Sequence, residues 1–114
     1  MTLQKTEHKG RLNRENEFKA EVKRWAEKIK VKPRQIRIQA MKKKWASCSS
    51  QGRVCFSSDL LKEPKDFKEY VMVHELLHLE IPNHGRVFKS LLSAYLPDCE
   101  KVLTRRNNKL ERQV

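Results

Sequence analysis

Residues 70–84 read YVMVHELLHLEIPNH, and this stretch decides how the chain folds. Most of it is apolar all the way round a helix, which is typical of a helix buried at the centre of a small domain. The same helix, predicted over 67–80, carries His74, Glu75 and His78. Ionisable side chains in such a place are costly unless they are paired or bound to a metal. We therefore interpret the segment as a functional site; the alternative is a pair of core histidines satisfied by hydrogen bonds.

The spacing of these three side chains is that of an HExxH motif. Histidines four residues apart project from one face of a helix, so both imidazoles can reach one tetrahedral ion. His74 and His78 are thus predicted ligands of Zn²⁺. Glu75 lies beside the first ligand, where it can act as general base on a zinc-activated water rather than bind the metal.

A third ligand is predicted at His84. Pro82 ends the first helix, and Asn83 is a suitable N-cap for a second helix whose inward stripe would include His84. The apolar residues of that stripe are Val87, Phe88, Leu91, Leu92 and Tyr95. Glu80 and Glu100 are the alternative third ligands.

The rest of the chain predicts an α+β domain with a small three-stranded sheet. Residues 13–30 have the apolar period of an amphipathic helix, residues 35–39 alternate as a strand does, and two short strands follow at 45–49 and 53–57. A weak last helix is expected over 98–112. Residues 1–12 show no apolar period and are predicted to be a mobile tail, which leaves 13–114 as a single domain.

Three cysteines are too few for a disulfide framework. If Gln51 and Gly52 form a two-residue hairpin turn, Cys48 and Cys55 lie directly opposite each other. A cross-strand disulfide is then conceivable, but free thiols in a reducing compartment are the favoured interpretation.

Charge is distributed unevenly along the chain. The net charge is +12, and residues 1–44 hold 15 basic and 5 acidic side chains, whereas residues 59–81 hold 3 basic and 6 acidic ones. This excess favours contact of the basic N- and C-terminal segments with nucleic acid; the alternative is that it only keeps a small domain soluble. No apolar stretch approaches the length of a membrane span, and the first residues do not resemble a secretory signal. We expect a cytoplasmic monomer with no membrane contact.

Several separate motifs together resemble one family. The run from Lys44 to Ser50 (KWASCSS), the HELLHL segment, and the later Pro82-Asn83-His84 and Phe88 are similar to the YgjP-like metallopeptidases, which are related to the SprT-like zincin proteases. Ala46 stands where that family usually has glycine. The likeness covers roughly residues 34–103.

The resemblance implies a minimal zincin-like domain, with an N-terminal helix, the small sheet, the HExxH helix and a helix that carries the third ligand. It also implies that His74, His78 and His84 bind zinc and that Glu75 is catalytic. The predicted function is a zinc metalloendopeptidase that hydrolyses peptide bonds of protein or peptide substrates. The alternative is a basic module associated with nucleic acid, in which the zinc is structural or weakly catalytic.

Overall fold

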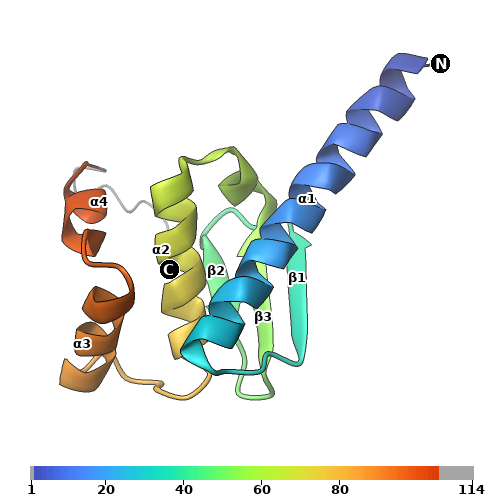
Figure 1. The fold of residues 1–114 in the computed structure, drawn as a ribbon. Helices are drawn as coiled ribbons and strands as arrows, with labels where there is room; N and C mark the ends of the chain where they lie inside the picture. The colour runs from blue at the N-terminus through green and yellow to red at the C-terminus, as the bar shows by residue number, and fades with distance from the viewer. Residues whose placement is uncertain (1, 106–114) are drawn as a thin grey trace.

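The computed structural model describes residues 2–105 and the side chains of residues 12–104. This part of the chain is an α+β domain with four α-helices, one 3₁₀ helix and a three-stranded sheet, as the sequence predicts. In chain order the elements are α1 (Thr2–Ile29), β1 (Gln35–Gln39), β2 (Ala46–Cys48), β3 (Arg53–Ser57), η1 (Ser58–Lys62), α2 (Lys65–Leu77), α3 (Arg86–Tyr95) and α4 (Cys99–Arg105). Figure 1 shows their arrangement.

The strands form one sheet in the order β1-β3-β2. β1 runs parallel to the central β3, and β2 runs antiparallel to it. Val54 and Phe56 of β3 are fully buried, and they lie in register with Ile36 and Ile38 of β1. The alternation predicted for 35–39 therefore places its isoleucines on the core face. β2 is an edge strand, so one of its sides is open to a further strand.

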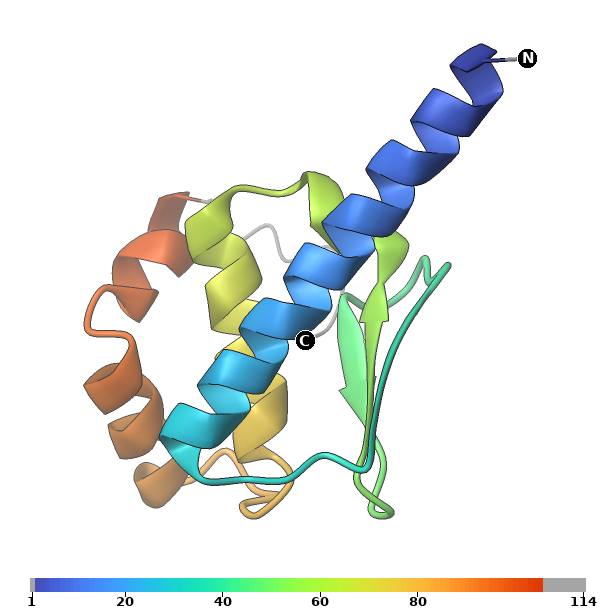
Figure 2. The same ribbon diagram turned by 45° about the vertical axis from the view of Figure 1, so that its right-hand side comes forward.

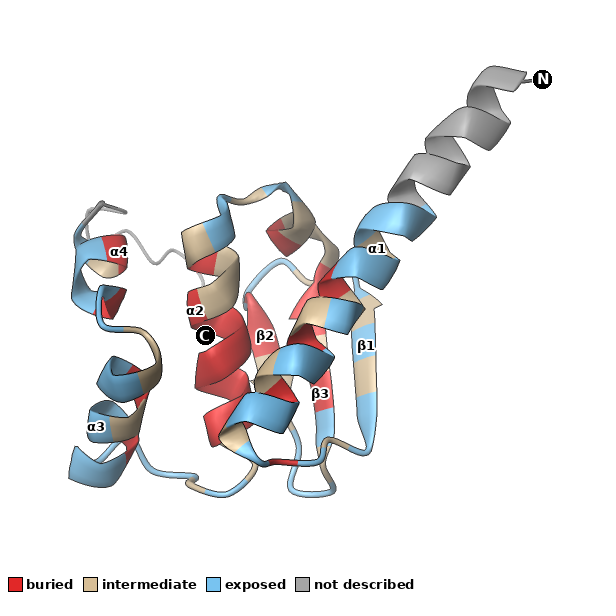
Figure 3. Ribbon diagram, viewed as in Figure 1, coloured by how far each residue is buried: buried red, intermediate tan, exposed pale blue. Residues whose placement is uncertain are grey.

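Helix α2 is the centre of the domain. It lies between the sheet and α1 on one side and α3 and α4 on the other (Figures 1 and 2). Burial is concentrated on it, as Figure 3 shows. Its buried residues are Phe67, Tyr70, Val71, Met72, Val73, His74, Glu75, Leu76 and Leu77. The apolar character around the whole helix is thus explained by neighbours on every side.

Helix α1 is longer than the sequence predicts. Phe18 and Val22 are buried, as expected for the amphipathic part. The helix begins at Thr2, however, so the predicted start at Asn13 is wrong. The segment before Asn13 lacks an apolar period, but Lys, Arg, Glu and Gln favour the helix without one. The division of the chain into a terminal tail and a single domain stays a prediction.

The β2–β3 hairpin has a three-residue loop, 50–52, rather than the predicted two-residue turn. Gly52 ends this loop with a φ of 86°, a conformation that favours glycine. The register pairs Cys48 with Val54, so the prediction that Cys48 lies opposite Cys55 is wrong. A shift of one residue puts the two thiols on opposite faces of the sheet. All three cysteines are free.

The ends of the last helices also differ from the predictions. α2 stops at Leu77, short of Glu80, because residues 78–80 continue as turns. α4 covers the first part of the helix expected over 98–112, and residues 106–112 lie outside the described residues. Within the described chain, none of the helices combines the length and the apolar character needed to cross a bilayer.

Candidate metal centre

The last turn of α2 presents the two histidines of the motif on one face. His74 is 6% exposed, and His78 is the half-buried C-cap residue of the helix. Their ring centroids lie 4.9 Å apart, as the four-residue spacing predicts. Between them in sequence, Glu75 is only 3% exposed and points to the neighbouring face.

His84 comes from the connection between α2 and α3 and not from a helix. α3 begins at Arg86, with Gly85 as its N-cap, so the predicted helix start at Asn83 is wrong. Gly85 has an extended backbone (φ −83°, ψ −164°). Because His84 lies before this extended residue, its position is set by the path of the loop and not by the helical repeat of α3.

The three imidazoles meet at their Nε2 atoms. The Nε2–Nε2 distances are 3.2 Å for His74 and His78, 3.1 Å for His74 and His84, and 2.7 Å for His78 and His84. Ligand atoms about 2.0–2.1 Å from one tetrahedral ion lie about 3.3–3.4 Å apart. Within the described residues, these three side chains are the group of potential metal ligands whose donor atoms come together. Neither Glu80 nor Glu100 is a member of that group.

The orientation of His78 is fixed by a hydrogen bond at its other nitrogen. Its Nδ1 lies 3.1 Å from the carbonyl oxygen of Ile81, which can only accept, so Nδ1 donates. The lone pair of the neutral ring is then on Nε2, toward the other two histidines. Such a backbone partner is common behind metal-binding imidazoles, where it sets the tautomer and the ring direction.

The ring of Phe88, on α3, contacts all three imidazole rings. Its ring centroid lies 5.0 Å from that of His74, 4.7 Å from His78 and 5.0 Å from His84, and the residue is 2% exposed. Val87, which the sequence predicts on the same inward stripe, is instead 62% exposed. α3 packs chiefly on α2, so its apolar face is narrower than predicted and does not include Val87.

Burial shifts the pKa of three residues in the last turns of α2 and at its C-cap, His74, Glu75 and His78. It lowers the pKa of His74 to about 3, with further lowering by His78 and His84. It also lowers the pKa of His78, an effect opposed by the hydrogen bond to Ile81. Neutral imidazoles are the form that binds metals. For Glu75, burial raises the pKa to about 7, and the charge of Lys44 opposes this shift.

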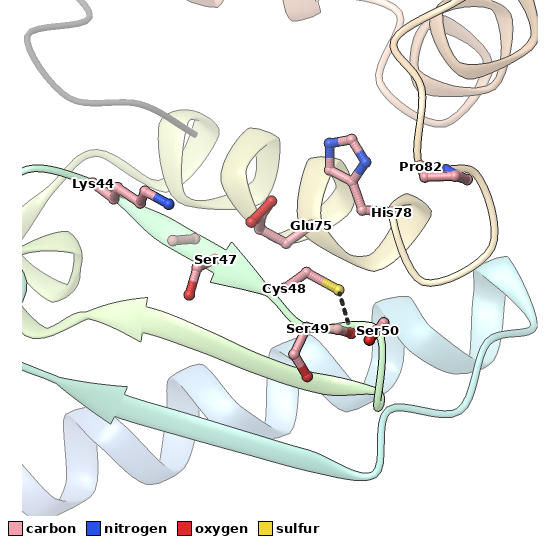
Figure 4. A pocket seen from close by; sticks show the side chains of 9 residues that line it. Lys44, Ser47, Cys48, Ser49, Ser50, Glu75, His78 and Pro82 are labelled. Atoms are coloured by element: carbon pink, nitrogen blue, oxygen red, sulfur yellow. Dashed lines mark hydrogen bonds between the residues drawn. The ribbon is translucent and has the colours of Figure 1, made fainter.

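Glu75 faces a pocket that runs along the edge strand (Figure 4). The pocket has a volume of about 350 Å³ and is lined by Lys44, Ala46, Ser47, Cys48, Ser49, Ser50, Glu75, His78 and Pro82. Oε2 of Glu75 is buried and has no hydrogen-bond partner among the described residues. The pocket therefore joins a free carboxylate oxygen, one of the converging imidazoles and an open strand edge.

The sequence analysis missed Lys44 and Cys48 as residues of this pocket. Both belong to the run before and within β2 that carries the family resemblance, and this was the available signal. The burial of Trp45, at 7% exposed and edge-on to Phe67, fits a core role for that residue.

The residue types fit a divalent transition metal. Three neutral imidazole nitrogens suit zinc, and also copper, iron or nickel. Nδ1 of His74 is buried without a hydrogen-bond partner among the described residues, so His74 depends on its Nε2 side for any compensation of its burial. An ion at the meeting point of the three Nε2 atoms would provide it.

A scan of protein-family models matches this chain to "YgjP-like, metallopeptidase domain" over residues 3–110. The chain belongs to the YgjP-like metallopeptidase family. The match covers more of the chain than the motifs alone suggest, since it includes most of α1. No curated protein sequence matches it.

Two solved structures share the fold of this YgjP-like chain. The metallopeptidase zymogen of Pyrococcus abyssi abylysin has a TM-score of 0.72 and 19% sequence identity, covering 85% of this chain and 98% of that one. The metallopeptidase zymogen of Methanocaldococcus jannaschii jannalysin has a TM-score of 0.73 and 25% identity, covering 82% and 96%. The zincin-like metallopeptidase fold is therefore present in this chain.

Proposed function

We propose that this metallopeptidase is a zinc-dependent endopeptidase in which His74, His78 and His84 hold the zinc and Glu75 is the general base. One observation carries the proposal. Three Nε2 atoms lie within 3.2 Å of one another, beside a buried carboxylate with a free oxygen. The preference for zinc rests on the imidazole donors and the HExxH spacing.

A zinc ion held there would polarise the scissile carbonyl and make water nucleophilic near neutral pH. Glu75 accepts the proton of the attacking water and then delivers it to the leaving amine. Its pKa of about 7 suits both tasks, because a group that titrates near the working pH can take and give a proton. Burial, the main cause of that pKa, also keeps bulk water away from the carboxylate.

The edge strand β2 supplies a binding site for the substrate backbone. It pairs with β3 on one side, and its open side borders the pocket that contains Glu75. An extended peptide can add to such an edge through main-chain hydrogen bonds, which are independent of its sequence. The peptide would then pass in front of the three histidines.

The test replaces Glu75 with glutamine, which keeps the size of the side chain and removes the base. Glu75→Gln should lower kcat on fluorescently labelled casein by about 10²–10⁴-fold. Zinc content, measured by elemental analysis, should stay at the wild-type value. The matched control is Glu80→Gln, because Glu80 is exposed and outside the histidine group, and it should retain full activity. Equal cleavage by wild type and Glu75→Gln would refute the assignment of the base.

Contact of the basic N- and C-terminal segments with nucleic acid is a second proposal, favoured by the excess of positive charge. No acidic residue occurs between Glu27 and Asp59, a stretch that includes the whole sheet. Binding to duplex DNA should weaken steeply with salt, and an absence of binding at low salt would contradict it. The relationship to SprT-like proteases, the monomeric state and the cytoplasmic location stay predictions.

A further inference from the structure

The two walls of the catalytic pocket differ in charge. One wall is β2 with its flanking residues, and it belongs to the acid-free stretch 28–58, which holds nine Lys and Arg residues. The other wall is the end of α2, where the pocket residues are Glu75 and His78. A substrate in this pocket therefore meets one basic residue of that stretch, Lys44, on the strand side and the carboxylate of Glu75 on the helix side.

Lys44 is the single Lys or Arg among the residues that line this pocket. In Figure 4 its side chain extends along the strand toward Glu75, while His78 and Pro82 lie beyond Glu75. Lys44 is itself exposed, and a bend at the buried Trp45 separates it from Ala46, the first residue of β2. The ammonium thus reaches the pocket from the strand wall, on the far side of Glu75 from the metal ligand His78.

Lys44 forms no ion pair with the described residues, although its charge lowers the pKa of Glu75. No ion pair within 4.0 Å joins it to Glu75, whose Oε2 is without a partner, and the three ion pairs found in the described chain involve other residues. Two other cations of the acid-free stretch have neighbours elsewhere: Lys42, which precedes β2, pairs with Asp59, and Arg37 of β1 lies beside Cys55. An unpaired cation inside a catalytic pocket is available to a substrate.

We propose that Lys44 forms a subsite for a substrate carboxylate, so that the enzyme favours peptides with an acidic group a few residues from the scissile bond. The inference rests on the proposed function, because it places the scissile bond at the three histidines. A peptide added to β2 advances about 3.3 Å per residue. The peptide residue whose backbone lies at His78 and the peptide residue whose side chain reaches Lys44 can therefore be a few positions apart.

The test uses internally quenched peptides that differ at one position, Glu against Gln, scanned along both sides of the scissile bond. Wild type should cleave the Glu peptide with a kcat/KM about fivefold higher at one position, through KM. Lys44→Met should remove this preference and Lys44→Arg should keep it. The matched control is Lys43→Met, which removes the same charge from an adjacent lysine outside the pocket. This variant should keep the preference for the Glu peptide. A second peptide pair, amidated or free at the C-terminus, distinguishes an acidic side chain from a terminal carboxylate.

Two results would overturn the inference. One is a Glu/Gln ratio of one at every position in wild type, with no preference for a free C-terminus. The other is an equal fall in kcat for Glu and Gln peptides in Lys44→Met, which would mean that Lys44 acts on Glu75 and not on the substrate.

A binding measurement separates this inference from the proposed function. Fluorescence anisotropy of the same peptides with the Glu75→Gln variant reports the carboxylate preference without cleavage. In one outcome, wild type cleaves none of the peptides, and the Glu peptide still binds about fivefold more tightly than the Gln peptide in a manner that depends on Lys44. The peptidase proposal then fails and the subsite stands. If wild type cleaves the peptides and neither assay depends on Lys44, the subsite proposal fails and the peptidase proposal stands.

Discussion

The two parts of the candidate metal centre are built differently. His74 and His78 belong to α2 and its C-cap, in a helix enclosed by other elements, whereas His84 lies on an exposed connection two residues before α3. The helical part is positioned by the core and would exist in any fold that buries α2. His84, in the loop, reaches the other two histidines because α3 packs on α2 and so holds the end of the loop close to α2. The centre therefore joins a half held in a buried helix to a half held by an exposed loop.

The strongest test of this comparison replaces one histidine from each half. His74→Ala and His84→Ala should each weaken zinc binding by at least about 100-fold, since each removes a ligand. Their effects on the metal-free fold should differ. His74→Ala leaves a gap in the core and should cost about 2 kcal/mol, whereas His84→Ala should stay within about 0.5 kcal/mol of wild type. Zinc titration and urea unfolding with a chelator measure the two effects, and equal destabilisation would contradict the comparison.

Phe88 connects the two halves, because its ring contacts all three imidazoles. Phe88→Ala should destabilise the protein by about 3–5 kcal/mol and weaken zinc binding by about 10–100-fold. Phe88→Leu retains most of the volume and should recover most of the stability but less of the zinc affinity, since leucine cannot replace the stacking on His78 or the edge contacts with His74 and His84. If zinc affinity followed stability in both variants, Phe88 would be a packing residue without a positioning role.

A further effect concerns pH and the helical half alone. In the metal-free protein, burial raises the pKa of Glu75 from 4.5 to about 7, so the folded chain holds a proton there that the unfolded chain releases between these values. This contribution to stability is present at low pH and is lost as the pH rises through 7. Glu75→Gln has no such proton, and His74 is common to both proteins. The variant should therefore gain about 2.5 kcal/mol over wild type between pH 5 and pH 8, measured by urea unfolding with a chelator. A pH-independent difference would show that Glu75 is solvated.

Local patterns predicted the order of the elements and the bounds of two strands, but not the start of α1, the hairpin loop or the start of α3. The strands 35–39 and 53–57 match the predicted bounds, because their alternation and the flanking turn signals are local. The pair His74 and His78 was predictable because a helix fixes the geometry of residues four apart. His84 was predicted at the site for a reason that the structure corrects: it was expected on a helix and lies in a loop.

The sequence by itself determined the buried helix, its HExxH spacing and the segregation of charge along the chain, since each depends on residues close together in sequence. The tertiary structure alone decided the parallel pairing of β1 with β3, the one-residue shift of the hairpin, the meeting of His84 with α2 and the position of Lys44 beside Glu75. The pairing of β1 with β3 and the position of Lys44 beside Glu75 join segments far apart along the chain, whereas the other two depend on the path of a loop. Their geometry depends on how the helices and the sheet pack together, and no local pattern of residues encodes that packing.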